Sequence, residues 1–271
     1  MPTVDRWYSA YLFDLDGTIY LGEEVLPTVV ETLGRIRQRG VPVRFVSNNP
    51  TKSPVQYLDK LTRFGVDAEL SEIVNTLVTT TGWLRTHRPE AVVFPIGEQP
   101  LIDALAEAGI AMSDDPARID VVLASYDRRF DYRKLQIAFD ALWFHRRAVL
   151  MSTNPDRYCP FPGGRAEPDA AAIVAAIEAS TGVVCERTFG KPSAQLLEVI
   201  GAGLGVQLSE AIMVGDRLAT DIAMARRSGM DAALVLTGDS RREDIDAVPE
   251  AERPTWVVET LADLLPSSRR G

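Results

Sequence analysis

Short apolar runs alternate along this chain with longer stretches whose apolar residues recur at helical spacing. Residues 8–13, 41–47 and 210–216 are short apolar runs, and residues 27–39 have helical periodicity. Such alternation predicts parallel strands joined by helices, which form a doubly wound parallel sheet. We therefore expect an α/β fold.

The middle of the chain has an alternation of its own and is typical of an inserted domain. After a helix expected at 71–86, we expect strands at 91–96, 120–125 and 148–153, helices at 98–108, 131–145 and 170–180, and a loop or hairpin at 154–169. The predicted core comprises residues 1–81 and 188–271, and the predicted insert comprises residues 82–187.

Composition narrows the chemistry that the chain can carry out. The 271 residues are 46% hydrophobic and 25% charged, with a net charge of −9, which disfavours nucleic acid and anionic membranes as partners. No signal peptide or spanning segment is predicted, and two cysteines without metal spacing indicate a reducing, cytoplasmic location. With two histidines only, the chemistry must rest on carboxylates, Lys, Ser and Asn.

The first apolar run ends in two acidic residues, Asp14 and Asp16, followed by Gly17 and Thr18. Paired carboxylates at a strand end repel each other unless a cation lies between them or their roles differ. The alternative is a β-hairpin, because Asp-Gly between apolar runs is a strong turn signal. Taken alone, this stretch favours the hairpin.

Three further polar clusters follow apolar strands or precede helices. They are Ser47-Asn48-Asn49, Gly190-Lys191-Pro192, and Gly215-Asp216 with Thr220-Asp221. Each one alone is an ordinary loop, a helix lead-in or a helix cap. Because ligands of open α/β sheets bind at the carboxyl ends of the strands, the four clusters together predict one site.

These residue types suit phosphoryl transfer, which needs a nucleophile, a cation on the phosphoryl oxygens and a proton donor for the leaving oxygen. Asp14 would attack phosphorus and form an aspartyl-phosphate. Asp14, Asp16 and Asp216 offer the oxygen ligands that Mg²⁺ prefers. Further donors and positive charge would come from Ser47, Asn48 and Lys191.

The four clusters resemble the motifs of the haloacid dehalogenase (HAD) superfamily, over nearly the whole chain. DLDGT, SNN, GKP and GDRLATD are similar to its first to fourth motifs. The resemblance implies a Rossmann-like core, with Asp14 as nucleophile and metal ligand and Asp16 as acid and base that also binds Mg²⁺ through its carbonyl. It further implies that Ser47 binds phosphate and that Lys191 bridges phosphate and Asp14. The remaining implied magnesium residues are Asp216 and Asp221.

The insert lies between the second and third motifs, as in the class IIA group of NagD-like and 4-nitrophenylphosphatase-like enzymes. The resemblance therefore implies an α/β cap of the C2 type that covers the site and selects the substrate. Asp16 argues for a phosphatase within the superfamily. The core candidates for substrate binding are Thr18, Asn48 and Asn49.

The cap candidates follow two of its expected strands. Tyr126 and Asp127 follow one strand, and Asn154, Asp156 and Arg157 follow another. Ordinary turn chemistry explains these residues equally well. Relatives often carry a Gly-rich turn where this chain has Glu167-Pro168-Asp169-Ala170, so its cap loop differs from theirs.

We predict Mg²⁺-dependent hydrolysis of small phosphomonoesters, sugar phosphates first and 4-nitrophenyl phosphate as well. Two alternatives stay open. One is a phosphomutase or phosphotransferase on the same fold, and the other is a ligand-binding protein without turnover. The predicted partner is a small phosphorylated metabolite, without nucleic acid or membrane. The resemblance also leaves open a homodimer through the cap.

Overall fold

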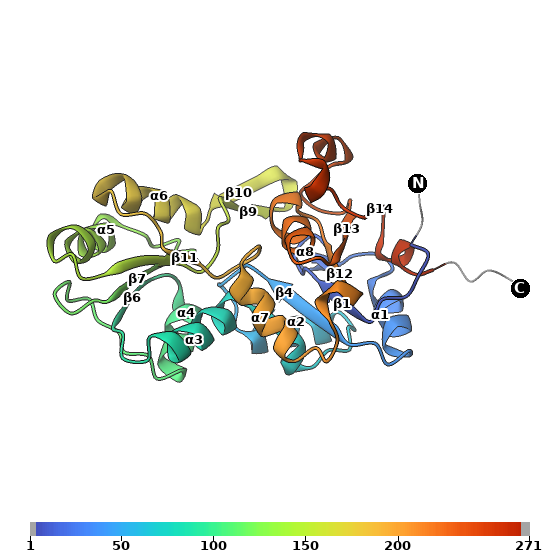
Figure 1. Ribbon diagram of the computed structural model, residues 1–271, viewed down its shortest axis with the longest axis horizontal. Coiled ribbons are helices and arrows are strands. Elements are labelled where there is room, and N and C mark those ends of the chain that lie inside the picture. The colour runs from blue at the N-terminus through green and yellow to red at the C-terminus, as the bar shows by residue number, and fades with distance from the viewer. Residues whose placement is uncertain (1–3, 267–271) are drawn as a thin grey trace, which may run out of the picture. The chain divides into compact units, whose positions relative to one another are not determined.

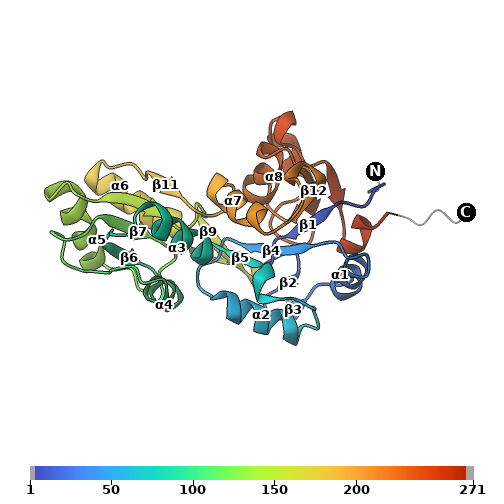
Figure 2. The ribbon, with the colours of Figure 1, turned by 60° about the horizontal axis from the view of Figure 1, so that its bottom comes forward.

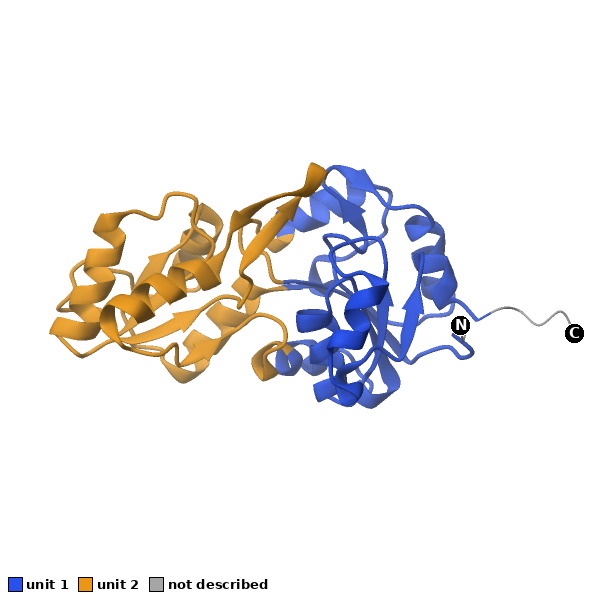
Figure 3. Cartoon of the chain, turned by 90° about the horizontal axis from the view of Figure 1, so that it is seen from above, with its two compact units in different colours: residues 1–47, 55–74, 197–271 blue, residues 48–54, 75–196 orange. Residues whose placement is uncertain are grey.

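The computed structural model describes residues 4–266 and divides into two compact units (Figure 3). The first unit is built from residues 1–47, 55–74 and 197–271, and the second from residues 48–54 and 75–196. The insert expected at 82–187 falls within the second unit, and its exact boundaries stay a prediction. Among the described residues, no helix has both the length and the apolarity that a membrane crossing requires.

The first unit contains a six-stranded sheet with the order β14-β13-β12-β1-β4-β5 (Figure 1). Its strands are β1 (Ala10–Phe13), β4 (Val43–Ser47), β5 (Ile73–Asn75), β12 (Ala211–Gly215), β13 (Asp231–Val235) and β14 (Trp256–Val258). The strand β1 pairs in parallel with β12 on one side and β4 on the other. The chain therefore leaves β1 toward β4 and later returns to its other side, which makes the β1 end a topological switch point.

Apolar residues on alternate positions of these strands form the core of the first unit. Tyr11 and Phe13 of β1 and Val214 of β12 belong to one buried cluster with Leu33 of α1 and Tyr57 of α2. The strands β4, β1 and β12 run next to one another in the turned view (Figure 2). The α-helices that lie wholly or mostly in this unit are α1 (Val29–Arg37), α2 (Pro54–Arg63), α7 (Ala194–Ala202) and α8 (Ala223–Arg227). A small hairpin is formed by β2 (Tyr20–Leu21) and β3 (Glu24–Val25).

The second unit has its own parallel sheet, with the order β11-β8-β7-β6. The strands are β6 (Val93–Ile96), β7 (Val121–Ala124), β8 (Val149–Ser152) and β11 (Arg187–Thr188). The helices are α3 (Thr76–His87), α4 (Gln99–Glu107), α5 (Tyr132–Phe139) and α6 (Ala170–Thr181). One buried cluster joins this sheet to α3 and α4, and another joins it to α5 and α6. The stretch expected as a loop or hairpin is an antiparallel hairpin of β9 (Tyr158–Phe161) and β10 (Arg165–Pro168).

The prediction of one helix over 71–86 was wrong at its start. Residues Ile73–Asn75 form the edge strand β5, and α3 begins only at Thr76, where the Asn75 side chain accepts a hydrogen bond from the backbone N–H of Val78. The apolar residues Ile73 and Val74 suit a buried strand, and Asn75 both ends that strand and caps α3, so the two elements adjoin without a loop.

Candidate active site

The strand β1 places Asp14 directly at its carboxyl end. The backbone N–H of Asp14 still donates to the carbonyl oxygen of Val214 at 2.9 Å, so the neighbouring strand fixes this position. Its side chain is buried, whereas Asp16 is exposed. Gly17 has a φ of 87° and donates its N–H to the carbonyl of Tyr20, which closes the turn that the Asp-Gly pair predicted. This turn leads into the β2–β3 hairpin.

The four residues implied as magnesium ligands differ in their geometry. Oxygens of the Asp14, Asp216 and Asp221 carboxyl groups lie within 4.8 Å of one another, and all three residues are buried. Asp14 follows β1, whereas Asp216 and Asp221 follow β12, so the pairing of two adjacent strands brings them together. The side chain of Asp16 is outside this group and accepts a hydrogen bond from the Tyr20 hydroxyl at 3.3 Å.

Backbone groups hold the two later acids of this group in place. The N–H of Asp239 donates to Asp216 Oδ2 at 2.7 Å, and the N–H of Arg217 donates to Asp221 Oδ2 at 3.1 Å. A Cβ atom at Gly215 would lie 2.3 Å from Asp221 Cγ, so that carboxyl group occupies space which only a glycine leaves. The positions of both acids are thus set by backbone from several segments.

The acidic group fits a hard divalent cation. Three carboxyl groups gathered in a buried place repel one another when they are ionised, and a cation bound to their oxygens removes that cost. Oxygen donors of this kind are the ligands that Mg²⁺ prefers. Asp14, Asp216 and Asp221 are therefore the described residues that could hold a metal ion.

Ser47 and Thr18 are the other core candidates in this unit. Ser47 ends β4, is buried, and its hydroxyl lies 3.3 Å from that of Tyr57. Thr18 is 1% exposed, and its hydroxyl has no hydrogen-bond partner among the described residues. Since a buried unbonded hydroxyl is costly, it is a natural place for a ligand's hydrogen bond.

In the second unit, the second and third motifs are joined by two hydrogen bonds. The backbone N–H of Lys191 donates to Asn48 Oδ1 at 2.6 Å, and Asn48 Nδ2 donates to the carbonyl of Lys191 at 3.2 Å. Both residues are buried, Lys191 to 2% exposure. The amide of Asn48 therefore fixes the backbone from which the Lys191 side chain projects.

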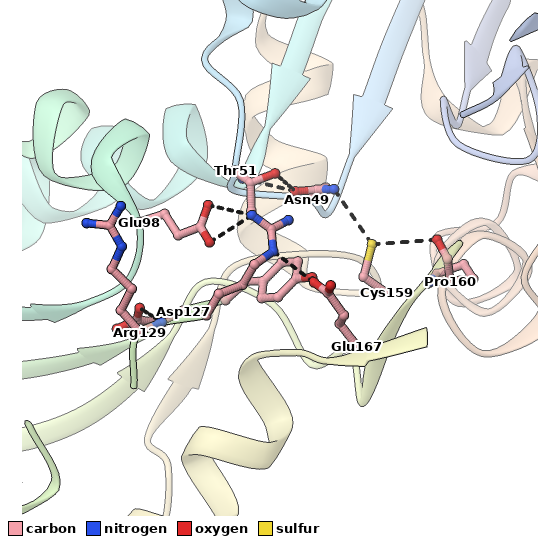
Figure 4. A network of polar contacts seen from close by, with 10 residues as sticks. Asn49, Thr51, Glu98, Asp127, Arg129, Cys159, Pro160 and Glu167 are labelled. Carbon is pink, nitrogen blue, oxygen red and sulfur yellow. Dashed lines mark hydrogen bonds and ion pairs between the residues drawn. The ribbon is translucent and has the colours of Figure 1, made fainter. Parts of the chain in front are cut away.

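Asn49 bonds to its own turn through its side-chain oxygen. Its Oδ1 accepts hydrogen bonds from the N–H of Thr51 at 2.9 Å and from the Thr51 hydroxyl at 2.7 Å, and its Nδ2 lies 3.9 Å from the sulfur of Cys159 (Figure 4). These contacts are typical of an Asx turn that shapes a loop.

Of the candidates after β8, two form a buried network at the start of a helix. Asn154 Nδ2 donates to Asp156 Oδ2 at 3.3 Å and to Asp169 Oδ1 at 3.1 Å, and Asp169 caps α6. The exposed Arg157 takes part through its carbonyl, which accepts the N–H of Asp169 at 3.1 Å. These contacts supply a structural role for Asn154 and Asp156.

The candidates after β7 belong to a charged network in the second unit (Figure 4). The Tyr126 hydroxyl donates to Glu167, and Arg128 donates to Glu167 at 2.8 Å and to Glu98 at 2.9 Å. These bonds from Tyr126 and Arg128 lower the pKa of Glu167, whereas burial and the bond to Glu167 raise the pKa of Tyr126. Asp127 makes an ion pair with Lys134 at 2.6 Å.

Sequence reasoning missed two residues near the turn after β1: Tyr20, which bonds to Asp16, and Lys60, which contacts Tyr20. Tyr20 is fully buried, and burial, with the neighbouring charge of Asp16, raises its pKa well above the ordinary value. The ammonium nitrogen of Lys60 lies 3.8 Å from the centre of the Tyr20 ring and donates to the carbonyl of Gly22 at 2.6 Å. A lysine among helical polar residues gives no sequence signal for this position.

Two known protein families match the segments of the chain that contain these motifs. Residues 11–111 match the family described as haloacid dehalogenase-like hydrolase, and residues 188–264 match a second family of HAD hydrolase-like proteins. Together the two matches contain all four of the polar clusters that close strands or precede helices in this chain.

Individual relatives are similar over nearly their whole length. The chain is 34% identical to the 5'-nucleotidase YutF of Bacillus subtilis over 262 residues, which is 96% of this chain and 99% of the relative. It is 36% identical to an acid sugar phosphatase of Staphylococcus epidermidis over 242 residues, covering 89% and 92% of the two chains.

A solved phosphatase structure is similar to this chain as well. The crystal structure of a 4-nitrophenylphosphatase from Thermotoga maritima superposes with a TM-score of 0.88 at 30% identity, covering 95% of this chain and 96% of the other. The predicted superfamily, the α/β fold and the assignment to the phosphatases are thereby confirmed.

Proposed function

This chain belongs to the haloacid dehalogenase-like hydrolases and is a phosphatase, and from that premise we propose that it hydrolyses small phosphomonoesters by way of an aspartyl-phosphate on Asp14. The observation that carries the proposal is the buried group of Asp14, Asp216 and Asp221 at the switch point of the core sheet. A nucleophilic carboxylate there has a place for the cation that phosphoryl transfer requires.

The first step forms a bond between an oxygen of Asp14 and phosphorus, and breaks the bond between phosphorus and the leaving oxygen. Asp16 gives that oxygen its proton. In the second step water attacks phosphorus, Asp16 takes the proton of that water, and the bond between phosphorus and Asp14 breaks to release phosphate. The exposure of Asp16 suits this exchange of protons with substrate and water.

Mg²⁺ held by Asp14, Asp216 and Asp221, with the carbonyl of Asp16, would supply positive charge to the phosphoryl oxygens. Ser47 and the backbone N–H of Asn48 would donate hydrogen bonds to phosphate, and the side-chain amide of Asn48 is bonded to the backbone of Lys191. The ammonium group of Lys191 would add a further positive charge, as the family resemblance implies.

For the substrate we propose small phosphorylated metabolites, with sugar phosphates and nucleotides first. The support is that matched relatives are named as an acid sugar phosphatase and a 5'-nucleotidase. Thr18 is a further candidate for contact with the substrate because its buried hydroxyl lacks a partner among the described residues. Within the cap, the exposed residue Arg157 would be the candidate for contact with a substrate, whereas Asn154 and Asp156 would orient the surrounding loop.

The test is phosphate release from a panel of phosphomonoesters, including 4-nitrophenyl phosphate, with Mg²⁺ and after chelation by EDTA. We expect Mg²⁺-dependent release by the wild type and a loss of at least about a thousandfold in Asp14→Asn. Asp59→Asn, at an exposed position of α2, is the matched control and should retain full activity. An active Asp14→Asn protein would refute the nucleophile, and activity that survives thorough chelation would refute the metal.

A second measurement tests the intermediate. Added glycerol should divert a constant fraction of product to glycerol phosphate, whatever the leaving group of the substrate, because every ester passes through the same aspartyl-phosphate. A fraction that changes with the leaving group would count against a common intermediate. Transfer that far exceeds hydrolysis would instead favour the phosphotransferase alternative.

A further inference from the structure

The segment that follows β13 belongs to none of the four motifs, yet it contacts the acidic group. Thr237, Gly238 and Asp239 form this segment, which we name the 237–239 loop. The N–H of Asp239 donates to Asp216 Oδ2 at 2.7 Å, and the Thr237 hydroxyl donates to the carbonyl of Gly17 at 2.6 Å. The next residue, Ser240, donates its N–H to the carbonyl of Asp216 at 3.0 Å. The loop thus contacts the side chain of Asp216 and the turn after β1, and Ser240 contacts the backbone of Asp216.

The space around the Asp216 carboxyl group is as specific as its hydrogen bonds. A Cβ atom at Gly238 would lie 1.9 Å from Asp216 Oδ2 and 2.5 Å from its Cγ. A Cβ atom at Gly17 would lie 2.4 Å from the same Oδ2 and 3.2 Å from the Cα of Gly238. The carboxyl group therefore occupies a slot between two glycine backbones, and a side chain on either of them would displace it.

Because Asp216 lies with Asp14 and Asp221 in the acidic group, rotation of its side chain would change the distances among the three carboxyl groups. Mutual repulsion favours such a rotation whenever no cation is bound. The slot and the Asp239 N–H oppose it, and groups that orient metal ligands in this way commonly raise metal affinity by about 10–100-fold.

We propose that the 237–239 loop is a positioning element that holds the Asp216 carboxyl group ready for a divalent cation, with Gly238 as its key residue. The proposal rests on the metal role assigned to Asp216 above. It adds residues outside the four motifs to the machinery of the site. A loop that only connects β13 to the following segment would affect stability and leave metal affinity unchanged.

The test measures Mg²⁺ binding to metal-free protein by titration calorimetry, together with the melting temperature without metal. We expect Gly238→Ala to weaken Mg²⁺ binding by about 10–100-fold, and excess Mg²⁺ to restore much of its kcat. Gly34→Ala, in α1 at a position with nothing within 4 Å of the added Cβ, is the control and should bind as the wild type does.

A second pair of variants covers the case in which Gly238→Ala does not fold. Thr237→Val removes the hydroxyl that binds the Gly17 carbonyl and should weaken Mg²⁺ binding by about fivefold, whereas Thr237→Ser keeps the hydroxyl and should restore binding.

The outcomes separate the two proposals. Wild-type Mg²⁺ affinity in a folded Gly238→Ala protein would overturn the positioning role and leave the proposed function intact. If Gly238→Ala does not fold, equal Mg²⁺ affinities of Thr237→Val and Thr237→Ser would have the same meaning. A wild-type protein that binds no Mg²⁺ would overturn the metal role itself.

Discussion

Replacing Tyr20 by phenylalanine tests whether the hydroxyl beside Asp16 assists the proposed proton transfer. The substitution removes one oxygen and leaves the ring, which packs tilted against Phe64 with the ammonium group of Lys60 on its face. The fold should therefore persist. The lost contact is the hydrogen bond from the Tyr20 hydroxyl to Asp16 Oδ2.

The size of the effect follows from the geometry of this bond. Hydrogen bonds to charged groups contribute about 1.5–3 kcal/mol, but the distance of 3.3 Å exceeds the usual range for two oxygens. Asp16 is also exposed, so water can replace the lost donor. We therefore assign about 1 kcal/mol, which corresponds to about a fivefold change in rate.

The assay compares kcat/KM for an alkyl phosphate with that for 4-nitrophenyl phosphate. An alkoxide needs a proton to leave, whereas 4-nitrophenolate leaves without one, so only the alkyl ester depends on a well-oriented acid. We expect Tyr20→Phe to lower kcat/KM about fivefold for the alkyl ester and less than about twofold for the aryl ester. Tyr11→Phe, whose hydroxyl contacts the Tyr8 backbone instead, is the matched control. Equal losses on both esters would refute this reasoning.

Three further predictions concern stability. Lys60→Met should lower the free energy of unfolding by about 2 kcal/mol in urea titrations, because it removes the bond to the Gly22 carbonyl and the contact with the Tyr20 ring; an unchanged value would contradict this. Burial alone would raise the pKa of Asp231, but hydrogen bonds from Tyr8, Arg6 and Thr255 lower it overall. Asp231→Asn should therefore cost about 1 kcal/mol at pH 7 and progressively less below about pH 4, as the wild-type carboxylate is protonated, and a pH-independent difference in melting temperature would speak against it. Glu167→Gln should speed hydrogen exchange of the β9–β10 amides at pH 7, since it weakens the bonds from Arg128 and Tyr126; exchange as slow as in the wild type would show that these bonds do not hold the hairpin.

The fold and the core of the candidate site could be predicted because they depend on local patterns. An apolar run that ends at Phe13 needs no distant information to place Asp14 at a strand end. The same holds for β12 and Asp216. Parallel pairing of β1 with β12 then brings the two acids together, as a doubly wound sheet requires.

The cap candidates show what local patterns leave undecided. Asn154 and Asp156 follow a strand, as a ligand-binding residue would, yet their side chains bond to each other and to the start of α6. Polar residues satisfy either a ligand or the backbone, and the sequence does not tell which partner is near. The edge strand β5 was missed for a similar reason, because three residues are too few to give a strand period.

The glycines beside the acids show why the packing around the acidic group could not be predicted from the motifs. Asp-Gly and Gly-Asp pairs suggest that each glycine is a turn residue that positions the acid next to it in sequence. In the structure Gly215, which precedes Asp216, leaves space for the carboxyl group of Asp221, while Gly17 and the distant Gly238 leave space for that of Asp216. The segment Thr237-Gly238-Asp239 also follows an apolar strand, so it is a fifth polar cluster of the kind that identified the other four. A search that examined the polar residues after every apolar strand would have included it.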